Sequence, residues 1–464
     1  MIKFGTDGWR AVIAQDFTFE NVRILSQAVA DYIKKQKNKG TQKVVIGYDR
    51  RFLSKEFAAE TANVLASNGI KVVLSNRDVP TPAVSYHCNK FGYNLGVMIT
   101  ASHNPSSFNG FKIKTPEGGS ADKNITDAVE KLLGKSKVKI SEQAELIKQK
   151  KIELSDLTTE YVGFFKSFID LPKVRKLKLK VLVDVMYGSG DNFVERILGK
   201  SNIAIDYLHN EFNPSFGGIN PEPVESNLAD MKKKMKTGKY DLGLVLDGDA
   251  DRIAMYDGKG NYINAQVILP LLAAHMVKNR KESGGIGKTV VGSNSIDKVA
   301  IDLGVACYET PVGFKYLSNL FQDKLICIGG EEAGGVGVKG YIPERDGSAI
   351  FLLILEMMTA EQKKFNELLT DFYKKYGKYY YSRMSVSVKA VKKSLSELKL
   401  PKDLLGGPVE RVNTLDGIKV IADDRWLMFR KSGTEPIVRV YAESRSQKLS
   451  QDLLKIGEKL INDL

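Results

Sequence analysis

The segment Asp247-Gly248-Asp249-Ala250-Asp251 places three carboxylates at alternate positions directly after the apolar run 242–246. In an extended backbone alternate side chains point the same way, so the three carboxylates are expected to converge on one point. A divalent cation would relieve their repulsion, and an all-oxygen ligand set favours Mg²⁺ or Mn²⁺ over zinc. An EF-hand is excluded, because its sixth and twelfth positions would be Arg252 and Gly258 in place of Gly and Glu. A solvated acidic turn remains the alternative.

A second polar loop, Thr100-Ala101-Ser102-His103-Asn104-Pro105, follows the apolar run 96–99. The Asn-Pro pair favours a turn, which is expected to hold the Ser102 hydroxyl exposed at the end of a strand. His103 beside it could transfer a proton or simply hydrogen-bond the loop. Taken alone, these residue types also occur in an ordinary turn.

Two further loops carry groups that bind sugars and anions. The segment 329–335 combines glycines with Glu331 and Glu332, so that backbone can approach a ligand and carboxylates can accept hydrogen bonds from sugar hydroxyls. The segment Arg430-Lys431-Ser432-Gly433-Thr434-Glu435-Pro436 offers a guanidinium, two hydroxyls and a glycine-bent backbone to a phosphate. Surface turns have similar compositions. Together, however, the four loops supply a hydroxyl nucleophile, a cation site, a polyol-binding site and an anion site.

The first three loops each follow the last strand of a strand–helix–strand–helix–strand pattern. This pattern occurs three times, with strands expected at 44–47, 70–74 and 96–99, at 181–184, 203–208 and 242–246, and at 289–292, 305–310 and 325–328. Such alternation predicts parallel-rich sheets covered by helices. Ligands of open α/β sheets bind at the carboxyl ends of the strands, and the three loops begin there, at Thr100, Asp247 and Gly329.

The remaining chain is organised differently. After Tyr376, alternating segments at 383–388, 418–422, 426–430 and 438–442 and a helical stretch at 447–464 predict an α+β module. The Lys-rich segment from Gly134 to Glu153 is expected to be a helical connector. The fold class is therefore α/β with four domains: three related α/β/α domains with mostly parallel sheets at 1–140, 155–255 and 256–375, and a C-terminal α+β domain at 376–464.

Composition narrows the class of protein. The chain has 464 residues, of which 43% are hydrophobic and 27% charged, which is typical of a folded chain rather than a disordered one. Its three cysteines form no CxxC pair, which excludes a disulfide framework and a thiolate zinc site. The N-terminal residues show no basic region followed by an apolar stretch, so no signal peptide is expected, and the longest apolar run, Val267 to Val277, is about half the length of a membrane span. A cytoplasmic location is expected.

The net charge of +14 does not by itself indicate nucleic acid. The lysine clusters at Lys34–Lys39, Lys173–Lys180 and Lys232–Lys236 are far apart, and no basic stripe interleaved with aromatic residues accompanies them. A positive field can instead attract small anionic substrates. We therefore expect a small anionic partner and neither a nucleic acid nor a membrane.

In combination the motifs resemble the α-D-phosphohexomutase superfamily over essentially the whole chain. Five segments carry the resemblance, in the family's order. They are similar to its N-terminal motif (Phe4–Arg10), phosphoserine loop (Thr100–Pro105), metal loop (Asp247–Arg252), sugar loop (Glu331–Gly335) and phosphate loop (Arg430–Pro436). The resemblance implies four domains around a central cleft, of which three are related. This agrees with the repeats counted above.

The resemblance also implies a reaction. Ser102 would carry a phosphoryl group, donate it to a hexose monophosphate and regain one from the other end of the bisphosphate, so that sugar 1-phosphate and 6-phosphate interconvert. Glucose 1,6-bisphosphate would be the intermediate and activator. One Mg²⁺ would be held by Ser102, Asp247, Asp249 and Asp251 and would neutralise the transferring group.

Further roles follow from the same resemblance. Arg10 and Arg252 would add positive charge, and Lys112 matches a family lysine placed for proton transfer, with His103 and Lys315 as further candidates. A lysine base needs a lowered pKa, and the alternative role for Lys112 is electrostatic support. The substrate-binding residues would be Glu331, Ala333, Gly313, Arg430, Ser432, Gly433 and Thr434. The partner would be a small phosphosugar, and the protein a monomer or homodimer.

Two positions depart from the pattern of many relatives. Ala333 stands where many have Ser, and Gly335 stands where some phosphomannomutases have a catalytic His. Two segments resemble phosphoglucomutases more than phosphoglucosamine mutases: the Glu331-Glu332 pair and Val312-Gly313-Phe314-Lys315. Glucose phosphate is therefore the first expected substrate and mannose phosphate the second, with glucosamine phosphate less favoured. A non-catalytic phosphosugar-binding protein is the remaining alternative.

Overall fold

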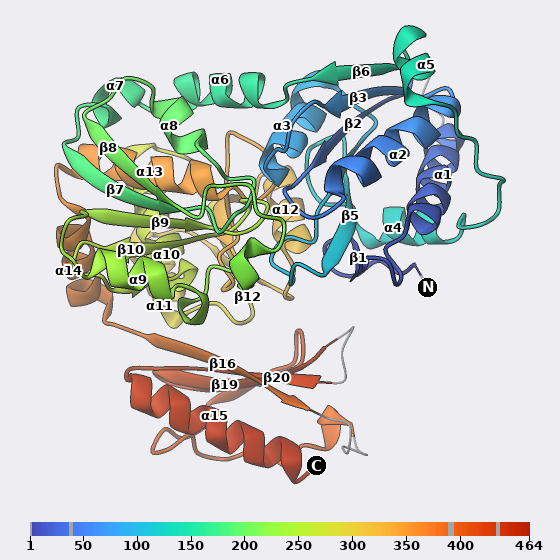
Figure 1. The fold of residues 1–464 in the computed structure, drawn as a ribbon. Helices are drawn as coiled ribbons and strands as arrows, with labels where there is room; N and C mark the ends of the chain where they lie inside the picture. The colour runs from blue at the N-terminus through green and yellow to red at the C-terminus, as the bar shows by residue number, and fades with distance from the viewer. Residues whose placement is uncertain (1, 37–39, 388–393, 433–436) are drawn as a thin grey trace. The chain divides into compact units, whose positions relative to one another are not determined.

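The computed structural model describes residues 2–36, 40–387, 394–432 and 437–464 (Figure 1). Two compact units divide the chain. The first unit comprises Met1–Asn264 and Ala333–Phe365, and the second comprises Ala265–Glu332 and Asn366–Leu464. Each unit therefore contains two separate stretches of chain.

The first unit begins with a six-stranded sheet of order β1-β5-β4-β2-β3-β6. Its strands are β1 (Trp9–Val12), β2 (Lys43–Tyr48), β3 (Lys71–Ser75), β4 (Leu95–Ile99), β5 (Phe108–Lys114) and β6 (Ile152–Ser155). The pairs β4–β2, β2–β3 and β3–β6 are parallel, whereas β5 runs antiparallel to both β4 and β1. Helices α2 (Ser54–Ser67) and α3 (Thr81–Phe91) pack on this sheet, and α1 (Phe19–Lys35) packs on α2 and on α4 (Lys123–Glu130).

A second sheet in the same unit has the order β11-β10-β9-β7-β8. Its strands are β7 (Leu179–Asp184), β8 (Ile203–Leu208), β9 (Leu242–Leu246), β10 (Ile253–Asp257) and β11 (Tyr262–Ile263). Strand β7 pairs in parallel with β8 and β9, and the hairpin β9–β10 is antiparallel. Helix α5 (Gln143–Lys148) packs on α2 and β6 of the first sheet, and the helices that follow it are α6 (Thr158–Phe168), α7 (Leu171–Val174), α8 (Phe193–Leu198) and α9 (Ala229–Met235).

Helix α13 (Gly347–Glu361) belongs to the first unit although it comes much later in the chain. It packs against β9, β10, α7 and α8. The helix is apolar on almost every side, with residues 347–358 buried, and such a helix needs partners all round. Its start therefore brings the residues just before it close to the ends of β9 and β10.

The second unit contains the third copy of the strand pattern. Strand β12 (Gly285–Thr289) lies in the middle and pairs in parallel with β13 (Cys307–Thr310) and β14 (Ile326–Gly330). The same arrangement, a first strand between the second and the third, occurs as β3-β2-β4 and β8-β7-β9 in the first unit. The expected threefold repeat and the α/β fold class are thus confirmed. The helices here are α10 (Ala265–Ala274), a π-helical turn at His275–Asn279, α11 (Asn294–Leu303) and α12 (Phe314–Gln322).

The C-terminal part of the second unit is an antiparallel sheet of order β16-β20-β19-β18-β17, in agreement with the expected α+β module. It follows α14 (Phe365–Tyr376) and comprises β16 (Tyr380–Ser387), β17 (Arg411–Asn413), β18 (Ile418–Ala422), β19 (Arg425–Lys431) and β20 (Ile437–Ser444). Helix α15 (Gln447–Asn462) packs on β20, β16 and β19 through residues such as Leu453 and Ile461. Val388, the expected end of the first strand, lies outside the described residues.

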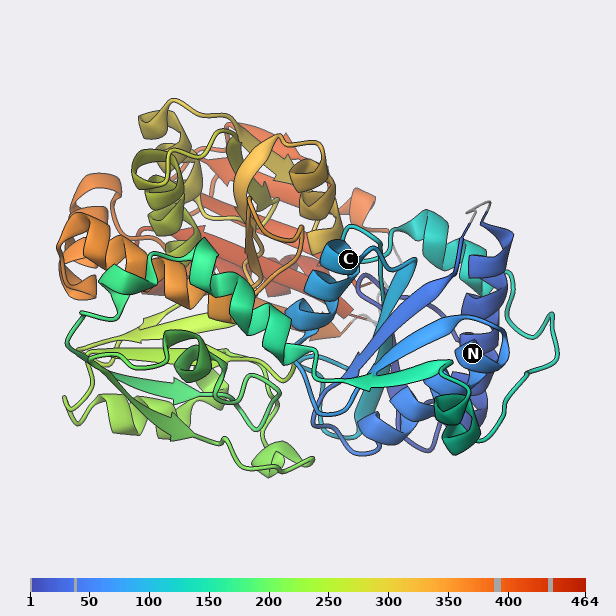
Figure 2. The ribbon, with the colours of Figure 1, turned by 90° about the horizontal axis from the view of Figure 1, so that it is seen from above.

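Some expectations were wrong. The segment 134–153 is not only a helical connector: after α5 it enters β6, which extends the first sheet beside β3 (Figure 2). The expected boundary between 255 and 256 falls inside β10, because the hairpin continues the second sheet to Ile263. The expected strand 289–292 is really 285–289; Val290 and Val291 instead pack against Trp426 and Met428. Within the described residues, no helix combines the length and apolar character needed to cross a membrane.

Candidate active site

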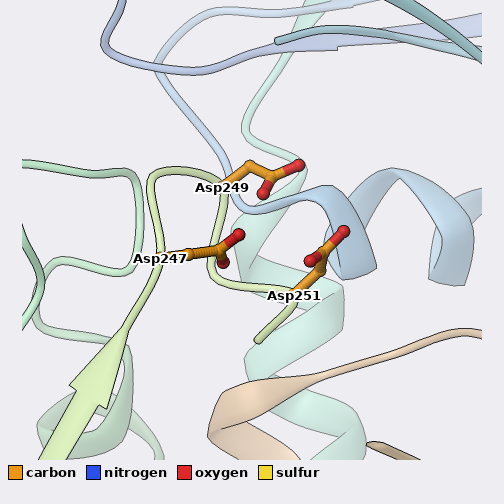
Figure 3. A group of neighbouring side chains, drawn as sticks. All are labelled: Asp247, Asp249 and Asp251. Atoms are coloured by element: carbon orange, nitrogen blue, oxygen red, sulfur yellow. The ribbon is translucent and has the colours of Figure 1, made fainter. Parts of the chain in front are cut away.

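The three aspartates of the metal-type loop converge, as predicted, at the end of strand β9. Asp247, Asp249 and Asp251 are fully buried, and each has a carboxylate oxygen within 4.8 Å of one from the others (Figure 3). The backbone is not extended as expected but turns, with Ala250 at φ +56° and its N–H donating to the Asp247 carbonyl. The carboxylates therefore meet because the chain turns around them, not because alternate residues share a face.

Two oxygens of this cluster are left for a cation. Asp249 Oδ1 and Asp251 Oδ1 are buried and accept no hydrogen bond from any residue that the structure describes. Unpartnered buried carboxylate oxygens are costly, and an oxygen-preferring divalent cation would satisfy them. Burial and the repulsion of Asp249 and Asp251 raise the pKa of Asp247 well above its ordinary value. The residues present therefore fit a bound cation.

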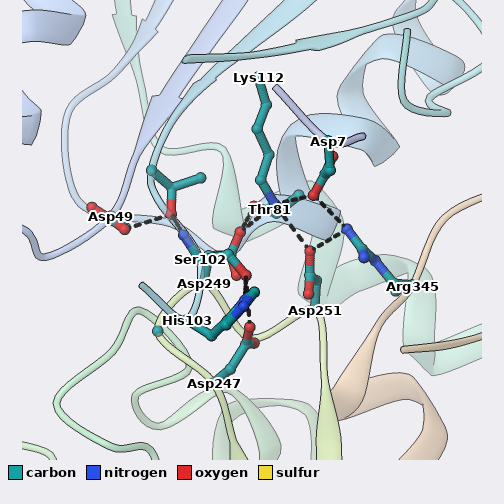
Figure 4. A network of polar contacts seen from close by, with 12 residues as sticks. Asp7, Asp49, Thr81, Ser102, His103, Lys112, Asp247, Asp249, Asp251 and Arg345 are labelled. Atoms are coloured by element: carbon teal, nitrogen blue, oxygen red, sulfur yellow. Dashed lines mark hydrogen bonds and ion pairs between the residues drawn. The ribbon is translucent and has the colours of Figure 1, made fainter. Parts of the chain in front are cut away.

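Ser102 lies against this cluster at the end of strand β4. Its hydroxyl donates to Asp247 Oδ2 over 3.0 Å, and its Oγ lies 3.4 Å from His103 Nδ1 (Figure 4). The residue is only 1% exposed, so the expectation of an exposed hydroxyl was wrong. Burial follows because the loop 101–105 folds back on itself in a turn, with the Asn104 N–H bonded to the Ala101 carbonyl, and packs on the aspartate loop.

Lys112, on β5, lies among carboxylates. Its Nζ is 2.8 Å from Asp249 Oδ2, 3.1 Å from Asp251 Oδ2 and 2.9 Å from Asp7 Oδ2. Burial alone would lower the pKa of Lys112, but these three anions raise it above its ordinary value. The lowered pKa expected of a lysine base is therefore wrong for this arrangement. Lys112 binds the Oδ2 edges of the carboxylates whose Oδ1 atoms are unpartnered.

Three residues of this network were not singled out from the sequence. Arg345 Nη2 donates to Asp7 Oδ2 at 2.7 Å and to Asp251 Oδ2 at 2.8 Å, and Thr81 Oγ1 donates to Asp249 Oδ2 at 2.6 Å (Figure 4). Lys112 and Arg345 hold the pKa of Asp7 well below its usual range although burial would raise it. Asp7 stands within the quoted N-terminal motif, which was the signal for it. No local pattern marks Thr81 or Arg345.

The two arginines expected near the phosphoryl group also lie in this part of the first unit. Arg10 Nη1 donates to Asn104 Oδ1 at 2.7 Å, beside the serine loop, and its Nη2 lies 3.5 Å from Asp7 Oδ2. The backbone N–H of Arg252 donates to Asp247 Oδ1 at 3.0 Å, and its Nε lies 4.0 Å from both Asp247 and Asp251. Ser102, His103, Lys112, Arg10, Arg252 and the three aspartates thus form one cluster.

Ala333 belongs to the first unit as well. The residues after it run beside the metal-type loop, because Gly335 pairs with Arg252 and the Ile253 N–H bonds the Gly334 carbonyl at 3.0 Å. A Cβ on Gly334 would come within 2.9 Å of the Ile253 carbonyl oxygen, so glycine is required for this approach. A side chain larger than glycine is therefore excluded at position 334, directly after Ala333.

The other expected substrate-binding residues lie in the second unit. Arg430 Nε donates to Asp416 Oδ2 at 2.8 Å, and the same oxygen accepts the Val312 N–H at 2.8 Å. Asp416 thus links Arg430 to the turn at Gly313. Gly313 has a φ of +133° and directly precedes helix α12. Lys315 lies over the ring of its neighbour Tyr316, 5.2 Å from its centre.

Four further expected positions remain, and the structure describes two of them. Glu331 directly follows β14, half-buried, and the next residue, Glu332, accepts a hydrogen bond from Thr289 at 3.4 Å. Ser432 is buried, with its N–H bonded to the Ile437 carbonyl. Gly433 and Thr434 lie outside the described residues. The roles of all these residues stay predictions.

Comparison with known families accounts for nearly the whole chain. Models of the phosphoglucomutase/phosphomannomutase α/β/α domains I, II and III match residues 1–139, 159–260 and 264–376, and the model of the C-terminal domain matches residues 384–455. The chain belongs to the phosphoglucomutase/phosphomannomutase family. It is a member of the α-D-phosphohexomutase superfamily and an enzyme, a mutase that acts as an intramolecular phosphotransferase.

Individual relatives of this mutase differ in the activity for which they are named. A phosphoglucomutase/phosphomannomutase of Thermococcus kodakarensis is 30% identical over 99% of this chain and 98% of its own. A phosphoglucosamine/phosphogalactosamine mutase of Sulfurisphaera tokodaii is 29% identical with the same coverage. The crystal structure of a Thermus thermophilus protein described as a phosphomannomutase superposes with a TM-score of 0.88 at 31% identity, covering 99% of each chain. The family is therefore clear, while these names differ in the sugar.

Proposed function

We propose that this mutase interconverts hexose 1-phosphates and hexose 6-phosphates, with glucose phosphate preferred, through a phosphoserine at Ser102. The observation that carries the proposal is the contact of 3.0 Å between Ser102 Oγ and Asp247 Oδ2, at the edge of three buried carboxylates. A serine hydroxyl beside a carboxylate cluster fits phosphoryl transfer, in which the protein mainly positions the reacting groups and neutralises charge. The net charge of +14 favours an anionic substrate.

In the proposed reaction, the bond between phosphorus and Ser102 Oγ breaks as the phosphoryl group passes to a hydroxyl of the sugar monophosphate. The hexose 1,6-bisphosphate then reorients, and Ser102 Oγ takes the phosphoryl group from its other end. The attacking hydroxyl loses a proton in each half-reaction, and the leaving oxygen gains one. His103, with Nδ1 3.4 Å from Ser102 Oγ, is the group placed to exchange that proton at the serine.

The residues also indicate how the charge of the phosphoryl group would be balanced. Asp247 Oδ2 and the unpartnered Oδ1 atoms of Asp249 and Asp251 would hold one Mg²⁺. When bound, such an ion neutralises the oxygens of the transferring phosphoryl group. Lys112 and Arg345 hold the opposite edges of the Asp249 and Asp251 carboxylates and so orient their free oxygens.

The roles in substrate binding are proposed for individual residues. Arg430 with the hydroxyls of its loop would bind the phosphate that is not being transferred, because a guanidinium suits an anion with several oxygens. Glu331 would accept hydrogen bonds from sugar hydroxyls. Glucose is favoured over mannose because the Glu331-Glu332 pair resembles phosphoglucomutases, and glucosamine phosphate is the third candidate.

The experiment is a side-by-side measurement of kcat/KM for glucose 1-phosphate, mannose 1-phosphate and glucosamine 1-phosphate, with Mg²⁺ and protein primed by glucose 1,6-bisphosphate. Ser102→Ala should abolish turnover while ligand binding persists. Ser107→Ala, in the same loop but exposed, is the matched control and should keep full activity. A higher kcat/KM for mannose 1-phosphate would reverse the sugar preference. Undiminished turnover by Ser102→Ala would remove Ser102 as the phosphoryl carrier.

A further inference from the structure

Ser102 is held in a backbone conformation that few residues adopt. Its φ is +52°, in the left-handed region that disfavours side chains with a Cβ, and the residue is buried. Such a conformation persists only where the surroundings hold it in place, and it is often found at functional sites. The conformation fixes where Oγ points, so whatever holds the backbone also sets the direction of the hydroxyl.

The side chain of Arg51 is bonded to four backbone carbonyls of the Ser102 loop. Nη2 donates to the carbonyl oxygens of Ser102 at 2.6 Å and Asn104 at 2.7 Å, and Nη1 donates to those of Pro105 at 2.8 Å and Phe108 at 3.1 Å. The side chain is entirely buried. Four carbonyls that converge on one planar guanidinium fix the course of residues 102–108, because each of the four terminal N–H groups has its own acceptor and the fork is rigid.

The same guanidinium is itself held from two other sides. Its Nε lies 3.2 Å from Asp49 Oδ2, and its plane lies 4.8 Å from the centre of the Phe216 ring. Asp49 Oδ2 also accepts the Thr100 hydroxyl at 2.6 Å, and Thr100 Oγ1 in turn accepts the Ser102 N–H at 2.8 Å. Asp49, Arg51 and Thr100 therefore hold Ser102 at both its N–H and its carbonyl; we name these three residues the serine clamp.

We infer that the serine clamp is the positioning device of the phosphoryl-carrying serine, with Arg51 as its main member. This inference rests on the proposed function of Ser102. Arg51 reaches Ser102 only through the backbone and contributes nothing to the reacting atoms, so its effect is on the direction of Oγ. In-line transfer is sensitive to direction, and a displacement of about 1 Å can reduce a rate by about 100-fold.

Arg50 offers a matched control in the neighbouring position. It is also a buried, paired arginine, but its three partners are Asp78 at 2.9 Å, Asp191 at 3.0 Å and the Asn210 carbonyl at 2.9 Å, none of them in the serine loop. Loss of Arg50 therefore reports the cost of removing a buried, paired guanidinium from this region. Loss of Arg51 reports that cost and, in addition, the release of Ser102.

The experiment compares Arg51→Lys, Arg51→Ala, Thr100→Val and Arg50→Ala with the wild type. For each, thermal unfolding, kcat and KM for glucose 1-phosphate, and the rate of phosphate uptake from glucose 1,6-bisphosphate by intact mass are measured. We expect kcat and phosphate uptake to fall about 100-fold in both Arg51 variants and about 10-fold in Thr100→Val, with KM within about twofold of the wild type. Arg50→Ala should lose thermal stability but keep kcat.

Rescue separates positioning from general damage. Guanidinium ion at millimolar concentration should raise the kcat of Arg51→Ala at least tenfold, because the ion can occupy the space left among the four carbonyls. It should not raise the kcat of Ser102→Ala. If Arg51→Ala does not fold, the kcat values of Arg51→Lys and Thr100→Val, compared with that of Arg50→Ala, decide whether Arg51 positions Ser102. Full kcat in a folded Arg51→Lys variant, or equal losses of kcat in the Arg50 and Arg51 variants, would overturn the inference. A wild type that neither takes up phosphate nor turns over would instead overturn the proposed function.

Discussion

Replacement of Lys112 by Met tests whether this lysine is the internal counter-ion of the carboxylate cluster. The variant keeps an unbranched side chain, shorter by one atom, but removes the ammonium that contacts Asp249, Asp251 and Asp7 at 2.8, 3.1 and 2.9 Å. Breaking a buried ion pair by removing one partner costs about 3–5 kcal/mol, because the other charge is left uncompensated. We expect the low end of that range.

The reason is that each carboxylate keeps another partner. Asp249 retains the Thr81 hydroxyl at 2.6 Å, and Asp251 and Asp7 retain Arg345 at 2.8 and 2.7 Å. A loss of about 3 kcal/mol corresponds to a fall of about 5 °C in the melting temperature of a unit of this size, because the unfolding entropy is about 2 cal/mol/K per residue. Because the pKa of Lys112 is raised, its stabilisation is fully present at neutral pH and is lost only as the pH rises above the ordinary lysine range.

The assay is thermal unfolding followed by circular dichroism, in EDTA and again with saturating Mg²⁺. Mg²⁺ should raise the melting temperature of Lys112→Met more than that of the wild type, since the ion supplies the positive charge that the variant lacks. Lys123→Met is the control: Lys123 pairs with Asp127 on the surface, 78% exposed, and its loss should leave the melting temperature unchanged. A Lys112→Met variant that melts within 1 °C of the wild type in EDTA would refute the counter-ion role.

Three other predictions follow from the same structure. Asp251→Asn should weaken Mg²⁺ or Mn²⁺ binding in calorimetry by at least about tenfold, whereas Asp257→Asn in the same hairpin should not; equal affinities would remove Asp251 from the cation site. Arg430→Ala should raise KM for the phosphosugar by about 10–100-fold, because a charge-assisted hydrogen bond contributes about 1.5–3 kcal/mol. The control Arg411→Ala, at an exposed arginine, should leave KM unchanged. An unchanged KM in Arg430→Ala would exclude Arg430 from the phosphate site. Burial raises the pKa of Asp346 to about 6, although the hydrogen bonds that its carboxylate accepts from Ala349, Tyr161 and Tyr341 act to lower it. Between about pH 4 and 6 the folded state therefore holds a proton that the unfolded state has lost. The stability of the wild type relative to Asp346→Asn should therefore fall as the pH rises through that window, by up to about 3 kcal/mol in urea unfolding, and parallel pH profiles would contradict the raised pKa.

The parallel strands could be predicted because burial on both faces leaves a continuous apolar run. Strands β2, β4, β7 and β9 were found in this way from runs such as Val44-Val45-Ile46. Strand β12 was misplaced for a physical reason: its sequence Gly285-Ile286-Gly287-Lys288-Thr289 has few apolar side chains. A Cβ on Gly287 would lie within 2.8 Å of Ile326 and Leu317, so the helix and the neighbouring strand supply the apolar contacts that the strand itself lacks.

The antiparallel strand β5 was not predicted, and the sequence pattern could not show that its charges are buried. Lys112 and Lys114 alternate with apolar residues in a pattern typical of a half-exposed strand, yet both lysines are nearly inaccessible. Their partners are Asp249, 137 residues away, and Glu344, 230 residues away. Local sequence marks neither contact, and only the folded first unit brings these charges together.

The long separation in sequence between these residues also explains which parts of the site the motifs could predict. Spacing alone located the three aspartates, because they follow one strand and converge through one turn. Spacing could not show that Lys112 and Arg345 bind the Oδ2 atoms and leave the Oδ1 atoms without partners, since these two residues come from distant segments. If the lysine and the arginine satisfied both edges of the carboxylates, a cation would have to displace them. Because they satisfy one edge only, the carboxylates can be held in place and still be open to a cation. The contacts of Lys112 and Arg345, which the sequence pattern could not show, therefore determine whether the three aspartates can bind a metal ion.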